Sequence, residues 1–181
     1  MSRSPAPPVD RQAISLELEQ ARARLHQLLA DADAADLRRE SRGTRWTNEQ
    51  LLFHMVFGYL IVRVLLRLVR VVSLLPAPVG RGFAALLNSA RRPFHVINYW
   101  GSCGGALVFD HARMGRLADR TIAALRRHLA GESDTCLRRE MPFPTSWDPY
   151  FQPVMTLAEV YRYPNQHFEH HRRQLTLHTR P

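Results

Sequence analysis

The chain has 181 residues, of which 45% are hydrophobic, and a formal net charge of +9. This length suits one domain with a sizeable core, and the composition excludes an intrinsically disordered protein. A strongly basic chain can bind nucleic acid or an anionic membrane. All 25 basic residues are arginine, however, and no run is longer than two. Such a pattern is typical of codon usage in a GC-rich genome, so we expect no nucleic-acid partner.

The cysteines and the N-terminal residues indicate in which cellular compartment we expect the protein. Cys103 and Cys136 form no CxxC pair, which excludes a zinc ribbon and a thioredoxin-type motif. Two free thiols fit a reducing cytoplasm, and residues 1–9 lack the apolar core of a signal peptide. We expect a cytoplasmic protein with a flexible tail over 1–9 and a single domain over 10–181.

The first half of the chain predicts two long helices. Asp10 can cap the first, whose apolar residues recur at steps of three and four. Residues 33–46 form a connection with room for a short helical turn. Thr47, preceded by Trp46, can cap the second helix, which runs to about Leu75 and ends before two prolines. The apolar stripe of the first helix consists of Ile14, Leu18, Ala21, Leu25, Leu28 and Ala32.

The second helix contains the apolar stretch 51–75, which has to be tested for membrane insertion. Arg63, Arg67 and Arg70 interrupt it on one helical face. Each central arginine would cost roughly 2.5–3.5 kcal/mol in lipid, and no stretch reaches the roughly 18 uncharged residues that a span needs. We expect no transmembrane segment. An amphipathic helix in a bundle is the first interpretation, and a helix lying on a membrane surface is the alternative.

The second half predicts one minor and two long helices. The minor helix covers about 79–90, and residues 91–104 are expected to be an irregular segment that ends in glycines. A long helix over about 105–130 follows and ends at Gly131. Residues 131–155 form a long loop, rich in proline and aromatic residues, and such loops are often functional. The apolar stripe of the 105–130 helix is Leu107, Met114, Ala118, Thr121, Leu125 and Leu129, and it includes His111.

The last helix begins at Thr156, where the stretch from Thr156 to Glu159 is a capping box. Pro164 should bend this helix or restart it. No strand pattern competes anywhere in the chain. The sequence therefore predicts an all-α protein, a four-helix bundle with an extra short helix and a long aromatic loop before the last helix.

The last helix carries the stretch QHFEHHRRQL, residues 166–175. His167 and His171 are four apart, so their Cβ atoms lie about 6 Å apart on one helical face. That spacing allows two imidazoles to bind one metal ion, although solvated side chains or a basic binding surface are alternatives. The pair continues the interior stripe, which favours the metal. A third ligand is best supplied by His54, for which the alternative is a core histidine with satisfied hydrogen bonds.

Two motifs resemble the DinB/YfiT-like metal-dependent hydrolase superfamily. One is RWTNEQLLFHM, residues 45–55, a tryptophan followed by a polar cap and a helix with one histidine. The other is TLAEVYRYPNQHFEHHRRQL, residues 156–175, a closing helix with a cap and an HxxHHxxQ cluster. The resemblance covers the chain after the tail, although residues 60–105 carry no recognisable motif, and segments 76–104 and 141–155 match no hallmark of the family.

The resemblance implies an up-down-down-up bundle with a divalent metal at one end. His54, His167 and His171 are the implied ligands, with zinc as the first choice and nickel or iron as alternatives. His170 is the family's additional histidine beside the site, and Gln174 could form a hydrogen bond near it. His170 or His111 could accept a proton.

The implied activity is that of a thiol S-transferase acting on a small-molecule substrate. A low-molecular-weight thiol is the expected cosubstrate, and mycothiol fits the GC-rich signature. The alternatives are a hydrolase or isomerase on the same site, or a non-catalytic bundle that binds a membrane surface or a partner protein. Assembly into a homodimer is also an open alternative, and no cofactor-binding residue beyond the histidines is predicted.

Overall fold

Four long helices form the body of the computed structural model, which describes residues 8–178. These helices are α1 (Arg11–Asp31), α3 (Asn48–Val72), α6 (His111–Ala130) and α8 (Leu157–Arg172). The all-α four-helix bundle is thereby confirmed. Of the expected tail, residues 1–7 lie outside the described residues, while the backbone N–H of Val9 donates to Asp134. Within the described part of the chain, no helix has both the length and the apolar content to cross a membrane.

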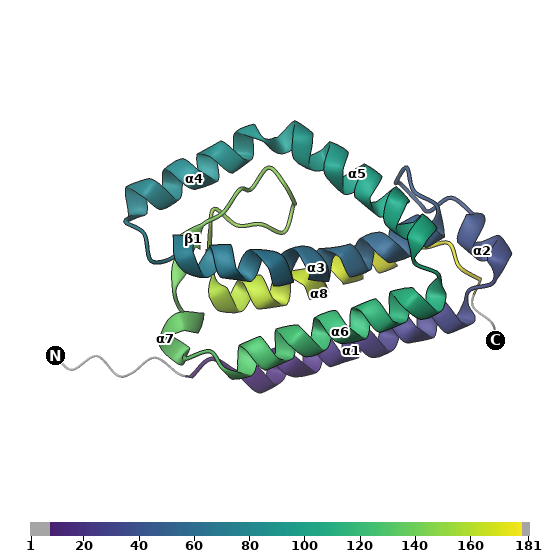
Figure 1. Cartoon of the computed structure of the whole chain (residues 1–181), viewed down its shortest axis with the longest axis horizontal. Coiled ribbons are helices and arrows are strands. Elements are labelled where there is room, and N and C mark those ends of the chain that lie inside the picture. The colour runs from purple at the N-terminus through teal and green to yellow at the C-terminus, as the bar shows by residue number, and fades with distance from the viewer. Residues whose placement is uncertain (1–7, 179–181) are drawn as a thin grey trace.

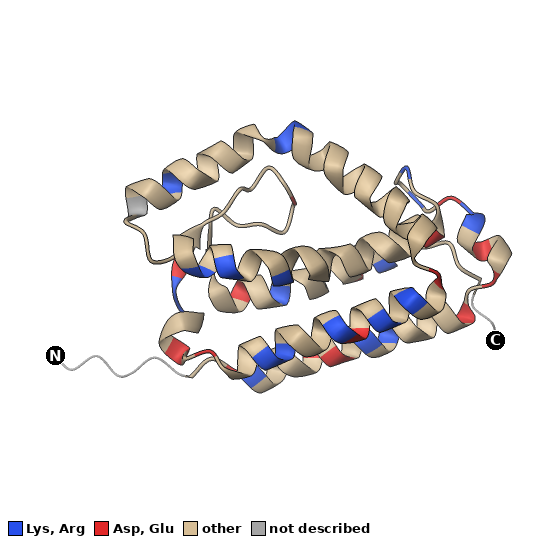
Figure 2. Cartoon of the chain, viewed as in Figure 1, with Lys and Arg blue, Asp and Glu red and all other residues tan. Residues whose placement is uncertain are grey.

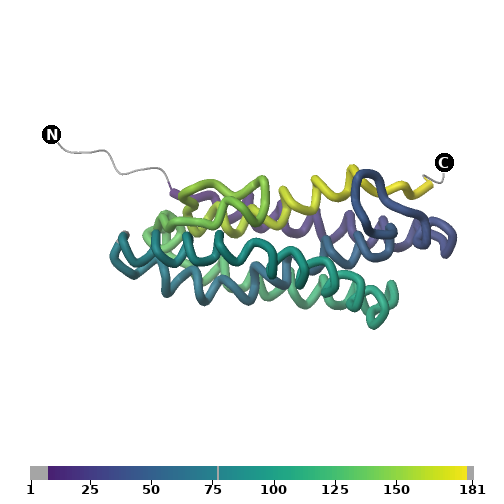
Figure 3. Tube along the Cα trace, turned by 90° about the horizontal axis from the view of Figure 1, so that it is seen from above, coloured from purple at the N-terminus to yellow at the C-terminus, as the bar shows by residue number. Residues whose placement is uncertain are grey.

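The helix directions explain the rest of the architecture. Helices α1 and α8 run one way and α3 and α6 the other, in the order up-down-down-up (Figure 1). Because α3 and α6 are consecutive long helices that run in the same direction, the chain must return along the bundle between them. Helices α4 (Ala77–Ser89) and α5 (Arg91–Val108) make that return. They form an arch that runs lengthwise along α3 in both views (Figures 1 and 3).

The predicted helix starts are confirmed by their caps. Asp10 accepts from the backbone of Ala13 at the start of α1. Thr47 forms a capping box with Gln50 at the start of α3, and Thr156 forms another with Glu159 at the start of α8. The expected helical turn in the connection is α2 (Ala34–Arg38). Each cap satisfies backbone N–H groups that the first helical turn leaves without partners.

The three arginines in the apolar stretch of α3 avoid the core. Arg63 and Arg67 are exposed, and the half-buried Arg70 pairs with Glu132. The buried stripe of α3 faces α6 and α8 instead. It packs in one core with the buried side chains Ile14, Leu18, Leu25, Met114, Ala118, Ile122, Leu125, Tyr161 and Phe168.

The prediction for residues 91–104 was wrong. They are helical, and α5 continues through three glycines to Val108, so the next helix starts at 111 and not at 105. Asp110 caps it by accepting from the backbone of Arg113. A Cβ on Gly105 would lie 1.9 Å from a ring carbon of Phe53, so this glycine serves close helix packing. Leu107, placed in the interior stripe by the sequence, is 88% exposed.

The all-α bundle also contains one pair of short strands that the sequence did not predict. Strands β1 (Glu140–Pro142) and β2 (Val154–Thr156) pair antiparallel and close the base of the long loop, after the short helix α7 (Asp134–Leu137). Three-residue strands are too short to display an alternating pattern. Helix α8 is continuous from Leu157 to Arg172 and includes Pro164, so no new helix begins at the proline.

The loop between the two strands lies beneath the arch (Figure 1). The indole N–H of Trp147 donates to the backbone carbonyl of Leu87 at 2.7 Å. The Trp147 ring also stacks on Phe94, with ring centroids 4.1 Å apart. The loop is therefore attached to both helices of the arch, and it forms one wall of the site described next.

Candidate metal centre

Three histidines meet at one end of the bundle. His54 lies in the second turn of α3, and His167 and His171 lie in the last turns of α8. Because α3 and α8 are antiparallel, the start of one helix lies beside the end of the other (Figure 1). One ring nitrogen from each histidine falls within 4.8 Å of the others. His54 and His167 are buried, and His171 is half-buried.

The hydrogen bonds of the outer ring nitrogens fix two of the tautomers. Ser102 donates its hydroxyl proton to the carbonyl of Asn98 at 2.8 Å, so its oxygen accepts from His54 Nδ1 at 3.1 Å. The amide oxygen of Gln174 accepts from His171 Nδ1 at 2.6 Å, as the sequence suggested for this glutamine. We infer that Nδ1 carries the proton in both rings, which leaves a lone pair on each Nε2.

These lone pairs face each other. His54 Nε2 and His171 Nε2 are 3.2 Å apart, and neither carries a proton to share in the neutral tautomers. Two nitrogens bound at 2.0–2.1 Å to one tetrahedral ion are separated by about 3.3 Å. The observed separation therefore fits a shared divalent cation.

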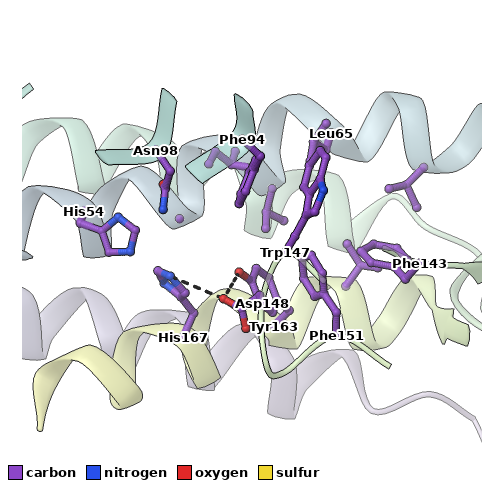
Figure 4. A pocket seen from close by; sticks show the side chains of 15 residues that line it. His54, Leu65, Phe94, Asn98, Phe143, Trp147, Asp148, Phe151, Tyr163 and His167 are labelled. Carbon is purple, nitrogen blue, oxygen red and sulfur yellow. Dashed lines mark hydrogen bonds and ion pairs between the residues drawn. The ribbon is translucent and has the colours of Figure 1, made fainter. Parts of the chain in front are cut away.

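His167 supplies an independent test of that fit. Its Nδ1 is buried and has no hydrogen-bond partner among the described residues. A buried imidazole nitrogen without a partner is costly, and a metal ion is one partner that removes the cost. The ring lies against Gly58, where an added Cβ would approach His167 Nδ1 to 2.9 Å. On the other side, His167 Nε2 is 3.9 Å from a carboxylate oxygen of Asp148 (Figure 4).

All three imidazoles are neutral near pH 7. Burial lowers the pKa of His54 well below its usual range, and the nearby His171 adds to the shift. Burial likewise lowers the pKa of His167 well below normal, helped by His54. Burial also lowers the pKa of His171, although its hydrogen bond to Gln174 opposes the shift. Neutral imidazole is the form that binds a metal.

An aromatic stack supports His54 from the side. The Trp46 ring lies on the His54 imidazole, with centroids 4.3 Å apart and planes at 27°. Tyr99 of α5 stacks on Trp46 at 6.0 Å, and the Arg45 guanidinium lies 5.1 Å from the Tyr99 ring centre. These contacts restrict the ring plane of His54 without using its nitrogens.

A narrow, mostly apolar pocket extends from the histidines beneath the arch (Figure 4). His54 and His167 form one end of it, and Asp148 stands beside them and accepts a hydrogen bond from the Tyr163 hydroxyl at 2.9 Å. None of the described lining residues is an arginine. The rest of the wall includes Val62, Leu65, Phe94, Asn98, Phe143, Trp147, Phe151 and Val160.

A helical bundle with a buried three-histidine cluster at one end is thus the class of protein that the fold and the site define. The family model of the DinB superfamily matches residues 17–175, and the chain belongs to this superfamily. No curated protein and no solved structure matched the chain.

The structure separates the predicted site residues into two groups. It brings His54, His167 and His171 together. His170 lies outside this group, with its Nδ1 3.1 Å from the Tyr150 hydroxyl and its ring edge-on to His171. His111 is the half-buried first residue of α6, also outside the group. A proton-accepting role for either one stays a prediction.

Sequence reasoning missed Asp148 and Ser102. Asp148 is the one carboxylate in residues 141–155, part of the loop that the sequence marked as functional only in general terms. Ser102 lies between glycines in a segment that was expected to be irregular. Its helical spacing from Asn98 was the one signal available, and that signal depends on recognising α5 as a helix.

Proposed function

We propose that this protein is a metal-dependent thiol S-transferase with His54, His167 and His171 as the metal ligands. The observation that carries the proposal is the convergence of three neutral imidazoles beside an apolar pocket. Zinc is the first choice of metal, with nickel or iron as alternatives, because imidazole ligands suit all three.

The ligand set favours thiol chemistry. When bound, a divalent cation would supply the positive charge that favours a thiolate over a thiol. Three neutral imidazoles hold the ion without cancelling its charge, whereas carboxylate ligands would reduce it. Asp148 lines the same pocket as His54 and His167, and it would accept the proton that a thiol entering this pocket releases.

The pocket favours an uncharged, apolar acceptor. Phe94, Trp147 and Phe151 offer flat apolar surfaces, and no described lining residue carries the positive charge that an anionic substrate would need. In the transfer, sulfur forms a bond to an electrophilic carbon of the acceptor, and the leaving group departs with the electron pair of the broken bond. A mycothiol-type thiol as cosubstrate rests on the arginine-only composition.

A hydrolase or isomerase on the same site is the second candidate. Asp148 favours it, because a carboxylate beside the histidines would serve water as well as a thiol. Both candidates need the same ligands and differ in the nucleophile.

The experiment begins with the metal content of the full chain, purified without a metal-chelating tag. We expect about one transition-metal ion per chain, lost in His167→Ala and retained in His128→Ala, an exposed histidine on α6. The metal-loaded protein is then incubated with glutathione or mycothiol and an apolar chromogenic acceptor. Formation of the thioether by wild type and not by His167→Ala supports the transferase.

Two results would go against the proposal. Full metal occupancy with hydrolysis of ester or amide probes and no thioether would favour the second candidate. Failure to bind zinc, nickel or iron after reconstitution would contradict both. Location in the cytoplasm and assembly as a homodimer stay predictions.

A further inference from the structure

The arch exposes several large apolar side chains to solvent. Along α5, exposed apolar side chains recur at steps of three, four and seven, and Trp100 is 67% exposed. Helix α4 exposes two more, Val79 and Leu86. We define the arch face as Val79, Leu86, Val96, Ile97, Trp100, Leu107 and Val108, all of them exposed.

The exposed side of α5 is more apolar than the solvent-facing side of an ordinary surface helix. The inner face of α5 already packs on α3, with Ser102 and Ala106 buried and Gly105 against Phe53. A surface helix normally places polar residues on its outer side. Of the exposed large apolar side chains in residues 8–178, all but Leu16 and Val154 lie within 50–109. Exposed apolar area gathered in this way marks an interaction surface.

The formally charged residues between Gln50 and Phe109 are all positive. The chain has 16 acidic residues, yet none lies between Gln50 and Phe109. The arch shows only basic and uncharged residues (Figure 2). Arg81, Arg91 and Arg92 are its exposed basic residues, and the last two stand where α4 meets α5. Exposed apolar side chains beside arginines, with no acidic residue among them, complement a partner that has an apolar interior and a negatively charged surface.

We propose that the arch face docks peripherally on an anionic lipid bilayer. The apolar side chains would enter the boundary between headgroups and acyl chains, where Trp100 is of a residue type enriched at membrane interfaces. Arg81, Arg91 and Arg92 would lie at the level of the lipid phosphates, where each adds to the affinity. The helices remain parallel to the membrane and do not span it.

A second copy of this chain is a less suitable occupant. A two-fold symmetric contact places the same patch on both sides, so Arg81, Arg91 and Arg92 of each copy would approach those of the other. No acidic residue of the arch is present to pair with them. The bilayer supplies the negative charge that a second copy lacks. This inference does not depend on the metal or on thiol chemistry.

The test is cosedimentation of the full chain with vesicles of phosphatidylcholine, with and without phosphatidylglycerol. We expect binding only to the anionic vesicles, weakened by salt because the Debye length shortens. A blue shift of tryptophan emission should accompany binding in wild type and be absent in Trp100→Phe, which keeps the apolar surface but removes the reporter.

Matched variants separate the contributions of the two kinds of residue. Ile97→Ser with Trp100→Ser should weaken binding on the order of tenfold or more, and Leu16→Ser, an exposed leucine on α1, should not. Arg91→Gln with Arg92→Gln should weaken it on the order of tenfold. Arg116→Gln with Arg120→Gln, exposed on α6, is the control for net charge. Circular dichroism melting confirms that each variant is folded.

Three outcomes would overturn the proposal. One is equal binding to neutral vesicles, and another is an equal loss of binding in the α6 arginine variant. The third is a dimer in light scattering that Ile97→Ser with Trp100→Ser dissociates, without vesicle binding by wild type. That result would assign the arch face to a second copy.

Discussion

Adding one methyl group at Gly58 should weaken metal binding while leaving the bundle folded. In Gly58→Ala the new Cβ would lie 2.9 Å from His167 Nδ1, whereas ordinary van der Waals contact begins at 3.4 Å. The imidazole must therefore move by at least about 0.5 Å, which is the tolerance of a preorganised site. We expect the dissociation constant for zinc to rise roughly 10- to 100-fold, as when a ligand loses its supporting contacts.

The same substitution has a limited effect on stability. Replacing glycine by alanine inside a helix gains about 0.5–1 kcal/mol, and overpacking costs about 1–3 kcal/mol. The free energy of unfolding should therefore fall by between about 0 and 2.5 kcal/mol, measured by chemical denaturation of the metal-free protein. Gly104→Ala is the control, because nothing lies within 4 Å of its Cβ. Wild-type zinc affinity in folded Gly58→Ala, measured by chelator competition, would refute His167 as a ligand held in this position.

Three further predictions concern the support of the site and the bundle. Gln174→Ala removes the acceptor of His171 Nδ1, so zinc affinity by chelator competition should fall about 10- to 100-fold. Burial alone would raise the pKa of Asp119, but hydrogen bonds from His26 and Arg22 outweigh it and lower the pKa. The stability that this lowered pKa provides is present above pH 3.8 and lost as pH falls through the folded-state value. Because Asp119 is partly exposed, wild type and Asp119→Asn should differ by less than about 1 kcal/mol in urea unfolding at pH 6 and converge in acid. Trp147→Phe keeps an aromatic ring but loses the indole N–H, which should cost about 0.5–1.5 kcal/mol in urea unfolding.

The parts of the fold that the sequence predicted correctly rest on local signals. Asp10, Thr47 and Thr156 are each followed by a backbone N–H that their own side chain satisfies, so the cap can be recognised without tertiary structure. The spacing of His167 and His171 is equally local, since one helical turn places both rings on one side. His54 joins them only because α3 and α8 are antiparallel. These helix directions could be inferred from the sequence only through the family resemblance.

The parts that were missed depend on tertiary contacts. Gly105 reads as a helix breaker in isolation, but in α5 it is the residue that lets the helix approach Phe53. The two strands pair with each other across the loop that lies under the arch. Asp148 reaches the histidines because Trp147, the preceding residue, is attached to the arch. None of these contacts leaves a periodic trace in the sequence.

Helix α5 contributes residues both to the surroundings of the metal centre and to the arch face. Its inner face supplies Ser102, which fixes the tautomer of His54, and Tyr99, which stacks on Trp46. Its outer face supplies Ile97 and Trp100 to the arch face. Because both side chains are mostly exposed, and the Trp100 ring meets the site only through its edge contact with Tyr99, replacing them should not move the histidines. Membrane binding and metal binding are therefore separable by mutation, although one helix supports both. A variant that lost both functions at once would indicate that α5 itself had unfolded.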